Sequence, residues 1–199
     1  MISRPLLLAS SSPYRKALLE RLGLPFTSAS PDIDESPATG ESAQQLATRL
    51  AREKAQALAP EHPGHWIIGS DQVACLPDGS ILTKPGNREL AIQQLSRSSG
   101  QTVCFLTGLA LLDADTGAIQ THCEPFDVEF RTLTLEEIEG YLDQEEPYDC
   151  AGSFKMERLG IALFRSLNGQ DPNSLIGLPL IALTDMLRDW GVNPLRAHR

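Results

Sequence analysis

Three serines and a basic residue stand where a short apolar stretch gives way to a helix. Residues 5–9 are apolar, Ser10–Ser12 follow directly, Pro13 suits the first helical position, and Arg15 falls in the first turn. A helix amino terminus offers free N–H groups and a positive dipole end, so cations there need a compensating anion. The stretch predicts a phosphate cradle. A serine-capped helix with exposed basic residues is the alternative, because the sequence has no GxxxxGK[ST] loop.

Lys54 is a second candidate, at the edge of the inward face of an expected helix. Ala47 and Leu50 precede it and Leu58 follows it at helical spacing. Its side chain either extends along the surface into solvent or points into a site. Without further information, extension into solvent is the simpler interpretation.

A carboxylate follows a glycine in an otherwise buried strand. The stretch Gly69-Ser70-Asp71-Gln72 interrupts a strand expected over residues 65–76. A glycine permits close approach, which suits a metal-binding or proton-accepting Asp71, although an Asp that caps a turn fits as well. Lys84, on the return stretch, could lie near Asp71, and a surface salt bridge would explain that pair equally.

An acidic turn over residues 32–35 could supply a further metal-binding carboxylate. Mg²⁺ prefers oxygen ligands and usually shares them with phosphates. Solvated loop charge is the simpler interpretation of the turn. Acyl transfer is disfavoured, because no Ser/His/Asp pattern surrounds the histidines, which are His62, His65, His122 and His198.

The elements that must position these residues alternate between strands and helices. A long hairpin is predicted over residues 102–112 and 119–131, around the turn Asp115-Thr116-Gly117. Strands mixed with helices and one long hairpin predict an α/β fold with a mixed sheet. The other predicted strands are 5–9, 26–30, 65–76 and 81–84. The predicted helices are one that starts at Pro13 and is closed by Gly23 as its C′ residue, 43–58, 88–96, one after Thr134, and 180–190.

Length and charge limit the classes of function. The 199 residues suit one globular domain or two lobes that share a core. A net charge of −9 disfavours non-specific binding to nucleic acid or an anionic membrane. No apolar run is long enough for a membrane span or a signal-peptide core. Four widely spaced cysteines are expected to be reduced residues of a cytoplasmic protein, and they disfavour a zinc site.

In their order and spacing, these motifs resemble the Maf family of nucleoside triphosphate pyrophosphatases. The resemblance implies two lobes around a central cleft, in one domain over residues 1–199 and similar in shape to the inosine triphosphate pyrophosphatases. It also implies hydrolysis between the α- and β-phosphates with a divalent cation, Mg²⁺ or Mn²⁺. The shared motifs are Leu8-Ala9-Ser10-Ser11-Ser12-Pro13 with Arg15, Asp34-Glu35, Glu53-Lys54-Ala55, Gly69-Ser70-Asp71, Lys84-Pro85, Tyr148–Gly152 and Gly177-Leu178-Pro179.

The resemblance assigns roles to individual residues. It gives Asp71 the position of the general base and Glu35 that of a supporting carboxylate, and these two would be the metal ligands. The positions that would bind phosphate oxygens are Ser10, Ser12, Arg15, Lys54 and Lys84.

Three positions resemble the YceF-like branch of the family, which acts on 7-methyl-GTP. Tyr14 stands where the thymidine and uridine branch has Arg and the YceF-like branch usually has Trp. Gln72 replaces a common Thr, and Glu157 ends a segment that replaces Gly-Tyr-x-x-Gln. An aromatic face and a carboxylate suit a cationic base with N–H donors, which Gln72 could contact or orient. Otherwise Tyr14 packs on Leu18 and Glu157 is a solvated loop charge.

We therefore expect a 7-methyl-GTP pyrophosphatase. A pyrophosphatase for dTTP, UTP or another modified nucleotide is the first alternative. A non-catalytic nucleotide-binding regulator of cell division is the second, and the presence of Asp71, Lys54 and Lys84 argues against it. The expected partner is a nucleotide substrate rather than nucleic acid or a membrane, and the sequence leaves open whether the chain forms a homodimer.

Overall fold

One mixed β-sheet runs through the whole molecule. The computed structural model describes residues 4–196. The strand order is β2-β1-β3-β5-β6-β7, with β4 paired to β3. β1 is parallel to β2 and β3, and the remaining pairs are antiparallel, so the predicted α/β mixed sheet is confirmed. The strands are β1 (Leu6–Ala9), β2 (Phe26–Ala29), β3 (Trp66–Cys75), β4 (Ile81–Leu82), β5 (Thr102–Asp113), β6 (Ile119–Phe130) and β7 (Phe164–Gly169).

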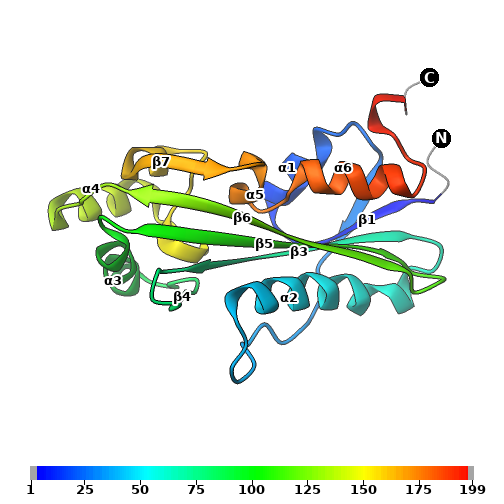
Figure 1. The fold of residues 1–199 in the computed structure, drawn as a ribbon, viewed down its shortest axis with the longest axis horizontal. Helices are drawn as coiled ribbons and strands as arrows, with labels where there is room; N and C mark the ends of the chain where they lie inside the picture. The colour runs from blue at the N-terminus through cyan, green and yellow to red at the C-terminus, as the bar shows by residue number, and fades with distance from the viewer. Residues whose placement is uncertain (1–3, 197–199) are drawn as a thin grey trace.

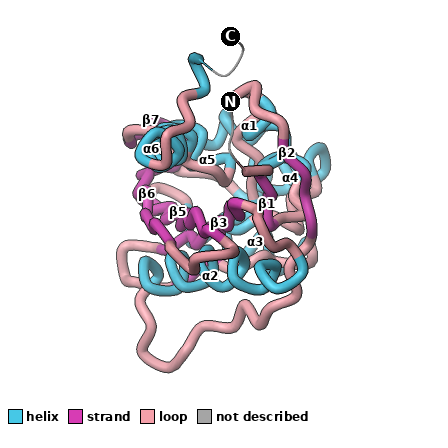
Figure 2. Tube along the Cα trace, turned by 90° about the vertical axis from the view of Figure 1, so that its right-hand side faces the viewer, coloured by secondary structure: helices cyan, strands magenta, loops and turns pink. Residues whose placement is uncertain are grey.

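Helices cover both faces of the sheet. α2 lies along one face, α1, α5 and α6 cover the other, and α3 and α4 stand at the far end of the β5–β6 hairpin (Figures 1 and 2). The helices are α1 (Pro13–Glu20), α2 (Ala43–Leu58), α3 (Arg88–Ser98), α4 (Leu135–Glu145), α5 (Pro172–Ile176) and α6 (Leu180–Asp189). Short 3₁₀ turns occupy Ala59–Glu61, Ala151–Ser153, Leu159–Leu163 and Pro194–Arg196. Within the described residues, no helix is long and apolar enough to cross a bilayer.

Local capping signals set the helix starts as predicted. Ser42 and Gln45 form a complete capping box at α2, and Thr134 and Glu137 do the same at α4. The side chain of Asn87 accepts a hydrogen bond from a backbone N–H at the start of α3. These caps satisfy backbone donors that have no partner within the helix, so they place each helix start in sequence.

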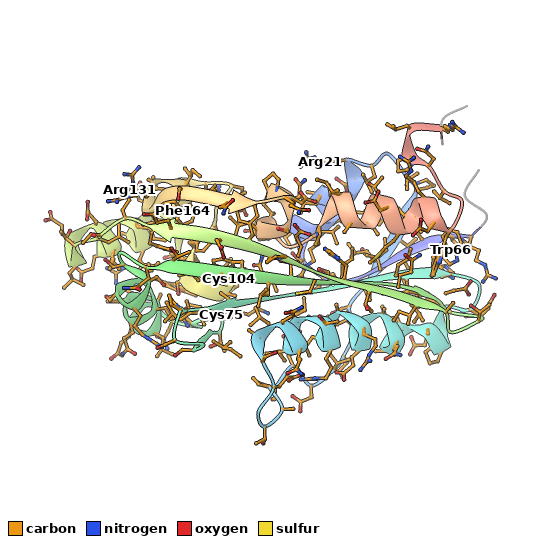
Figure 3. All side chains as sticks on the ribbon, in the orientation of Figure 1. Arg21, Trp66, Cys75, Cys104, Arg131 and Phe164 are labelled. Carbon is orange, nitrogen blue, oxygen red and sulfur yellow. The ribbon has the colours of Figure 1, made fainter. Side chains whose placement is uncertain are left out.

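Two larger hydrophobic clusters mark the two ends of the sheet, and two smaller ones lie beneath α2. Phe105, Phe130, Phe154 and Phe164 pack edge to face near α3 and α4, with ring centroids 4.8–5.9 Å apart. Trp66 packs at a tilt of 55° against Trp190, with centroids 5.0 Å apart, beside α6. Trp66 and Phe164 mark these two ends in Figure 3. The segment between the two ends is where polar side chains enter the interior.

Two glycines allow α2 to lie directly on the sheet. A Cβ atom at Gly69 would lie 2.0 Å from the carbonyl oxygen of Ala51, and one at Gly108 would lie 2.1 Å from that of Ala47. Both distances are far below van der Waals contact, so neither position accepts a larger residue without movement of the helix. The alanines on this face of α2 complete the close contact.

Two boundary predictions were wrong. β3 continues without interruption through Gly69-Ser70-Asp71, because β5 pairs with it at each of these residues. α1 ends at Glu20, and a turn leads to Gly23, which has a φ of +65°. β7 and α5 were not predicted at all.

The cysteines are free thiols, and two of them face each other across the sheet. Cys75 on β3 pairs in register with Cys104 on β5, and the two are neighbours in Figure 3. Burial raises the pKa of Cys75 and raises that of Cys104 to about 12, helped by the adjacent Asp127. Both thiols are therefore protonated near neutral pH, which keeps them unreactive.

Candidate functional site

A cleft of about 740 Å³ opens where β1 ends. β1 pairs with β3 only as far as Gly69, whereas β3 continues to Cys75 with β5 as its neighbour. On the β1 side, β3 therefore has no strand partner between Gly69 and Ala74, where β4 begins to pair, and loops and α1 surround the gap. All ten predicted site residues line this cleft: Ser10, Ser12, Tyr14, Arg15, Glu35, Lys54, Asp71, Gln72, Lys84 and Glu157.

The turn from β1 into α1 forms one wall of the cleft. The Ser10 hydroxyl accepts a hydrogen bond from the Ser12 N–H at 3.1 Å, and the Ser12 hydroxyl accepts from the Arg15 N–H at 3.4 Å. Each hydroxyl keeps its own proton to donate. Ser12 is the predicted N-cap, and Pro13 follows it at the start of α1. The wall thus combines two hydroxyls with the positive end of a helix.

Arg15 is anchored by a distant backbone carbonyl. Its Nε donates to the Gly177 carbonyl oxygen at 2.8 Å, and the Ser70 hydroxyl lies 2.9 Å from the same oxygen. Burial lowers the pKa of Arg15, and the charges of Asp71 and Glu35 oppose that shift. The guanidinium remains charged at neutral pH, because the ordinary arginine pKa is so high.

Lys54 lies at the centre of the site. Its Nζ is 2.6 Å from Asp71 Oδ1 and 2.7 Å from Glu35 Oε1, and its side chain is only 9% exposed. Extension into solvent, the simpler interpretation of the sequence, was therefore wrong. The close contact of α2 with Gly69 explains the position, because Lys54 lies one helical turn from Ala51, beside the carboxylate of Asp71 on the same face of β3.

The two carboxylates differ in exposure. Asp71 is buried in the middle of β3 and pairs with Gly108 of β5, so the turn-capping alternative was wrong. Glu35 is half-exposed on the loop before α2. Burial raises the pKa of Glu35, but the hydrogen bond and charge of Lys54 outweigh that effect, so the pKa lies below its ordinary value.

Lys84 contacts a different partner from the one considered in the sequence. Its Nζ is 4.0 Å from Glu35 Oε2, and the described residues form no ion pair between Lys84 and Asp71. β4 pairs only with the last two residues of β3, beyond Asp71, so Lys84 follows the strand onto the rim of the cleft. Its side chain is 64% exposed, which leaves the ammonium free to move toward a ligand.

Arg49 holds the loop that carries Glu35, a role that the sequence analysis missed. Its guanidinium binds both carboxylate oxygens of Glu41, at 2.7 and 2.9 Å, and donates to the Ser36 carbonyl at 3.0 Å. The hydrogen bonds from Arg49 lower the pKa of Glu41 to about 2. Residues 36–41 are thereby fastened to α2, one turn before Lys54.

The residues expected to contact the base line the same cleft. Tyr14 is half-buried on α1 and lines the cleft, whereas Leu18 lies in the hydrophobic core. Burial raises the pKa of Tyr14; the charge of Lys155 opposes this and that of Glu157 adds to it. Tyr14 lines the cleft together with Asp149, Lys155 and Glu157.

Gln72 is held by α5. Its Nε2 lies 2.9 Å from the Ser174 carbonyl oxygen, 3.0 Å from that of Leu175 and 3.2 Å from the hydroxyl of Thr107. Strand alternation directs Gln72 to the face opposite Asp71. Because its amide nitrogen is engaged, only its carbonyl oxygen is available to a ligand in this arrangement.

The sequence analysis also missed the residue that positions Gly177. Asp171 is fully buried, and its two carboxylate oxygens accept from the backbone N–H groups of Asn173 and Ile181, both at 2.8 Å. One side chain thereby connects the starts of α5 and α6, on either side of Gly177. The dipeptide Asp171-Pro172 is a helix-start signal that could have revealed α5.

Comparison with known proteins shows the family of this chain. The chain is a member of the Maf family, because residues 5–190 match the family described as "Maf-like protein". It is 62% identical over 188 residues to the 7-methyl-GTP pyrophosphatase of Pseudomonas syringae pv. tomato, covering 94% of this chain and 97% of that protein. It is 60% identical over 187 residues to the 7-methyl-GTP pyrophosphatase of Pseudomonas aeruginosa, with the same coverage.

Among solved structures, the chain is similar to a HAM1 protein from Coxiella burnetii. The TM-score is 0.45 at 18% identity, over 64% of this chain and 73% of that one. Nothing about the site follows from a likeness at this level.

Proposed function

We propose that the chain hydrolyses 7-methyl-GTP to 7-methyl-GMP and diphosphate. The observation that carries the proposal is the cluster in which Lys54 joins Asp71 and Glu35, inside a cleft that also exposes the serines and Arg15 of the β1–α1 turn. The two relatives named 7-methyl-GTP pyrophosphatase, which match nearly the whole chain, support the choice of substrate.

Asp71 is suited to accept the proton of the attacking water. The reaction forms a bond from the water oxygen to the α-phosphorus and breaks the bond from the α-phosphorus to the bridging oxygen, which leaves with diphosphate. Asp71 is the more deeply buried of the two carboxylates. Its backbone is fixed by pairing with Gly108 of β5, and its carboxylate is fixed by Lys54. A fixed carboxylate within reach of a water is what general base catalysis requires.

Three cations near the two carboxylates suit the negative charge of the substrate and of the leaving diphosphate. Arg15, Lys54 and Lys84 supply three positive charges against the two carboxylates. Lys54 and Arg15 are held in place, whereas Lys84 lies on the rim and can follow the phosphates. Fixed donors directed at developing charge are among the larger contributions to catalysis.

A divalent cation fits the donor set. No group of three His, Cys, Asp or Glu side chains is placed for a metal among residues 4–196. Glu35 and Asp71 nevertheless converge on the same ammonium, and Mg²⁺ is commonly held by one or two carboxylates together with substrate phosphates. Glu35 and Asp71 would hold Mg²⁺ or Mn²⁺, which would polarise the phosphoryl oxygens when bound.

The test is a substrate panel. Purified protein with Mg²⁺ is incubated with 7-methyl-GTP, GTP, dTTP and UTP, and diphosphate release is measured. We expect the highest kcat/KM for 7-methyl-GTP. Equal or higher values for dTTP or UTP would overturn the substrate assignment, and absence of diphosphate from every nucleotide would overturn the activity.

A further inference from the structure

Arg15, Lys54 and Lys84 surround Asp71 and Glu35 and form what we call the phosphate wall of the cleft. A fourth cation, Lys155, lines the cleft outside this wall. Lys155 follows the 3₁₀ turn Ala151–Ser153, and its side chain is only 14% exposed. It lies with Asp149 and Glu157 on the segment over residues 149–157, which we call the base wall. A half-enclosed lysine in a ligand cleft needs an explanation beyond solubility.

The backbone of Lys155 is fixed by its surroundings. Its N–H donates to the hydroxyl of Tyr141 at 3.0 Å, and a Cβ at Gly160 would lie 2.3 Å from its carbonyl oxygen. Tyr141 is itself buried in the core beside α4. The backbone position from which the Lys155 side chain extends is therefore fixed by the fold. A residue that determines specificity needs such a fixed position.

The ammonium of Lys155 can donate more hydrogen bonds than it makes among the described residues. Its Nζ donates to the Glu145 carbonyl oxygen at 3.2 Å, and the nearest carboxylate, Asp149 Oδ1, lies 3.9 Å away. An ammonium carries three donors, and the described residues accept from one of them. Lys155, Glu157 and Tyr14 all line the same cleft.

The chemistry of the guanine edge matches this arrangement. Guanine presents the acceptor O6 beside the donors N1–H and N2–H₂. A carboxylate pairs with the donors and leaves O6 unpaired, and a buried acceptor without a partner is costly. We propose that Lys155 donates to O6 of the base while Glu157 accepts from N1–H and N2–H₂, an inference that rests on the proposed 7-methyl-GTP substrate.

This pairing selects for guanine over adenine. Adenine carries an amino group at the position of O6, which would direct a donor at the ammonium, and an acceptor at N1, which would face the carboxylate. Both contacts would be unfavourable, and discrimination of this kind exceeds what shape alone provides. Together Lys155, Asp149 and Glu157 carry a net negative charge, which remains compatible with a cationic methylated base.

The test uses Lys155→Met, which keeps the length of the side chain and removes its charge and donors. Substrates are 7-methyl-GTP, 7-methyl-ITP, which keeps O6 and lacks the N2 amine, and 7-methyl-ATP, which lacks O6. We expect kcat/KM to fall roughly 10–100-fold for the first two, mainly through KM, and to change little for 7-methyl-ATP. Lys155→Arg should recover part of the loss. The matched control is Lys16→Met, an exposed lysine outside the cleft.

A binding experiment separates base contact from phosphate contact and from a structural role. By calorimetry, Lys155→Met should weaken binding of the nucleoside 7-methylguanosine and leave binding of inorganic tripolyphosphate unchanged. The reverse pattern would make Lys155 a phosphate ligand and overturn the inference. A lower melting temperature with an unchanged substrate ratio would make Lys155 purely structural, with the same consequence.

The two proposals fail in different ways. Wild-type protein that hydrolyses 7-methyl-GTP, with a ratio to 7-methyl-ATP that Lys155→Met leaves unchanged, overturns the role of Lys155 alone. Wild-type protein that binds 7-methylguanosine but releases no diphosphate overturns the proposed activity, and nucleoside binding by the variant then decides the role of Lys155. Wild-type protein that hydrolyses 7-methyl-GTP but binds no 7-methylguanosine overturns the base contact of Lys155 and leaves the proposed activity standing.

Discussion

The two walls of the cleft are built in opposite ways. At the centre of the phosphate wall, Lys54 stands on α2 and Asp71 on β3, and the contacts from Lys54 to Asp71 and to the loop residue Glu35 are 2.6 and 2.7 Å long. The base wall lies on irregular chain with left-handed backbone at Glu146 and Ser153, and its lysine makes contacts of 3.2 and 3.9 Å. Asp71 and Lys54 are thus fixed by the sheet and α2, whereas Lys155 and Glu157 sit on a segment that can change without disturbing the sheet.

The chemical consequence is a division of charge. Three cations and two carboxylates give the phosphate wall a positive balance, which suits an anion. Lys155 with Asp149 and Glu157 gives the base wall a negative balance, which suits a cationic base. Substitutions on the first wall should therefore change the rate for every nucleotide, and substitutions on the second should change the ratio between nucleotides.

The largest effect is expected at Asp71. Asp71→Asn should lower kcat by roughly 10²–10⁴-fold for every substrate, because the amide cannot take the proton from water. Nucleotide binding and the fold should be kept, since the side chain has the same shape. Stopped assays of diphosphate release and calorimetric titration with 7-methyl-GTP measure the two quantities. Near-normal turnover would show that Asp71 is not the base.

The next effect should appear as a changed ratio. The double variant Tyr14→Arg with Glu157→Gln should lower kcat/KM for 7-methyl-GTP relative to dTTP by roughly tenfold or more, through loss of the aromatic face and the charged acceptor. Initial rates with both nucleotides give the ratio. If both rates fall in parallel, Tyr14 and Glu157 do not contact the base.

The effects of replacing the two lysines of the phosphate wall should differ according to how deeply each lysine is buried. Lys54→Ala should lower kcat/KM for all triphosphates and also the melting temperature, since it leaves two carboxylates without their shared partner. Lys84→Ala should lower kcat/KM alone, because its side chain is mostly exposed. Lys16→Glu, outside the cleft, should change neither. Equal effects at all three positions would indicate general electrostatic attraction rather than a defined site.

The smallest effect concerns acid stability through Glu35. Its folded pKa is depressed, so it stabilises the fold above its unfolded pKa of about 4.3 and loses that contribution as the pH falls through the folded value. Glu35→Gln should therefore lower the free energy of unfolding at pH 7 by no more than about 1 kcal/mol, after screening by solvent. Urea titrations should show the difference shrinking as the pH is lowered below about 4.3. A difference that grows in acid would contradict the assignment.

Local signals in the sequence were sufficient for most helices and strands. Three helices are capped by hydrogen bonds between residues three positions apart, from the side chains of Ser12, Ser42 and Thr134. Because both partners lie close together in the chain, the sequence pattern alone predicts these caps. β7 could not be predicted in this way. It is an exposed edge strand with no alternation of apolar and polar residues, and only pairing with β6 defines it.

The centre of the site depends on tertiary packing that no local pattern reveals. Glu35, Lys54 and Asp71 come from a loop, a helix and a strand, and helical periodicity placed Lys54 only at the edge of a face. What brings its ammonium to Asp71 is the contact of the α2 backbone with Gly69 and Gly108. The identity of the candidate residues was therefore accessible from the sequence, and their pairing was not.

The glycine contacts beneath α2 also restrict changes in chain length. Ala47 and Ala51 rest on Gly108 and Gly69, and Lys54 follows three residues later. One residue inserted or deleted between Ala51 and Lys54 would turn the lysine by about 100° around the helix axis and move it about 1.5 Å along it. The ammonium would then leave Asp71 and Glu35, although every residue of the site would still be present. Relatives that vary freely in the length of their surface loops should therefore keep the length of this half of α2 constant.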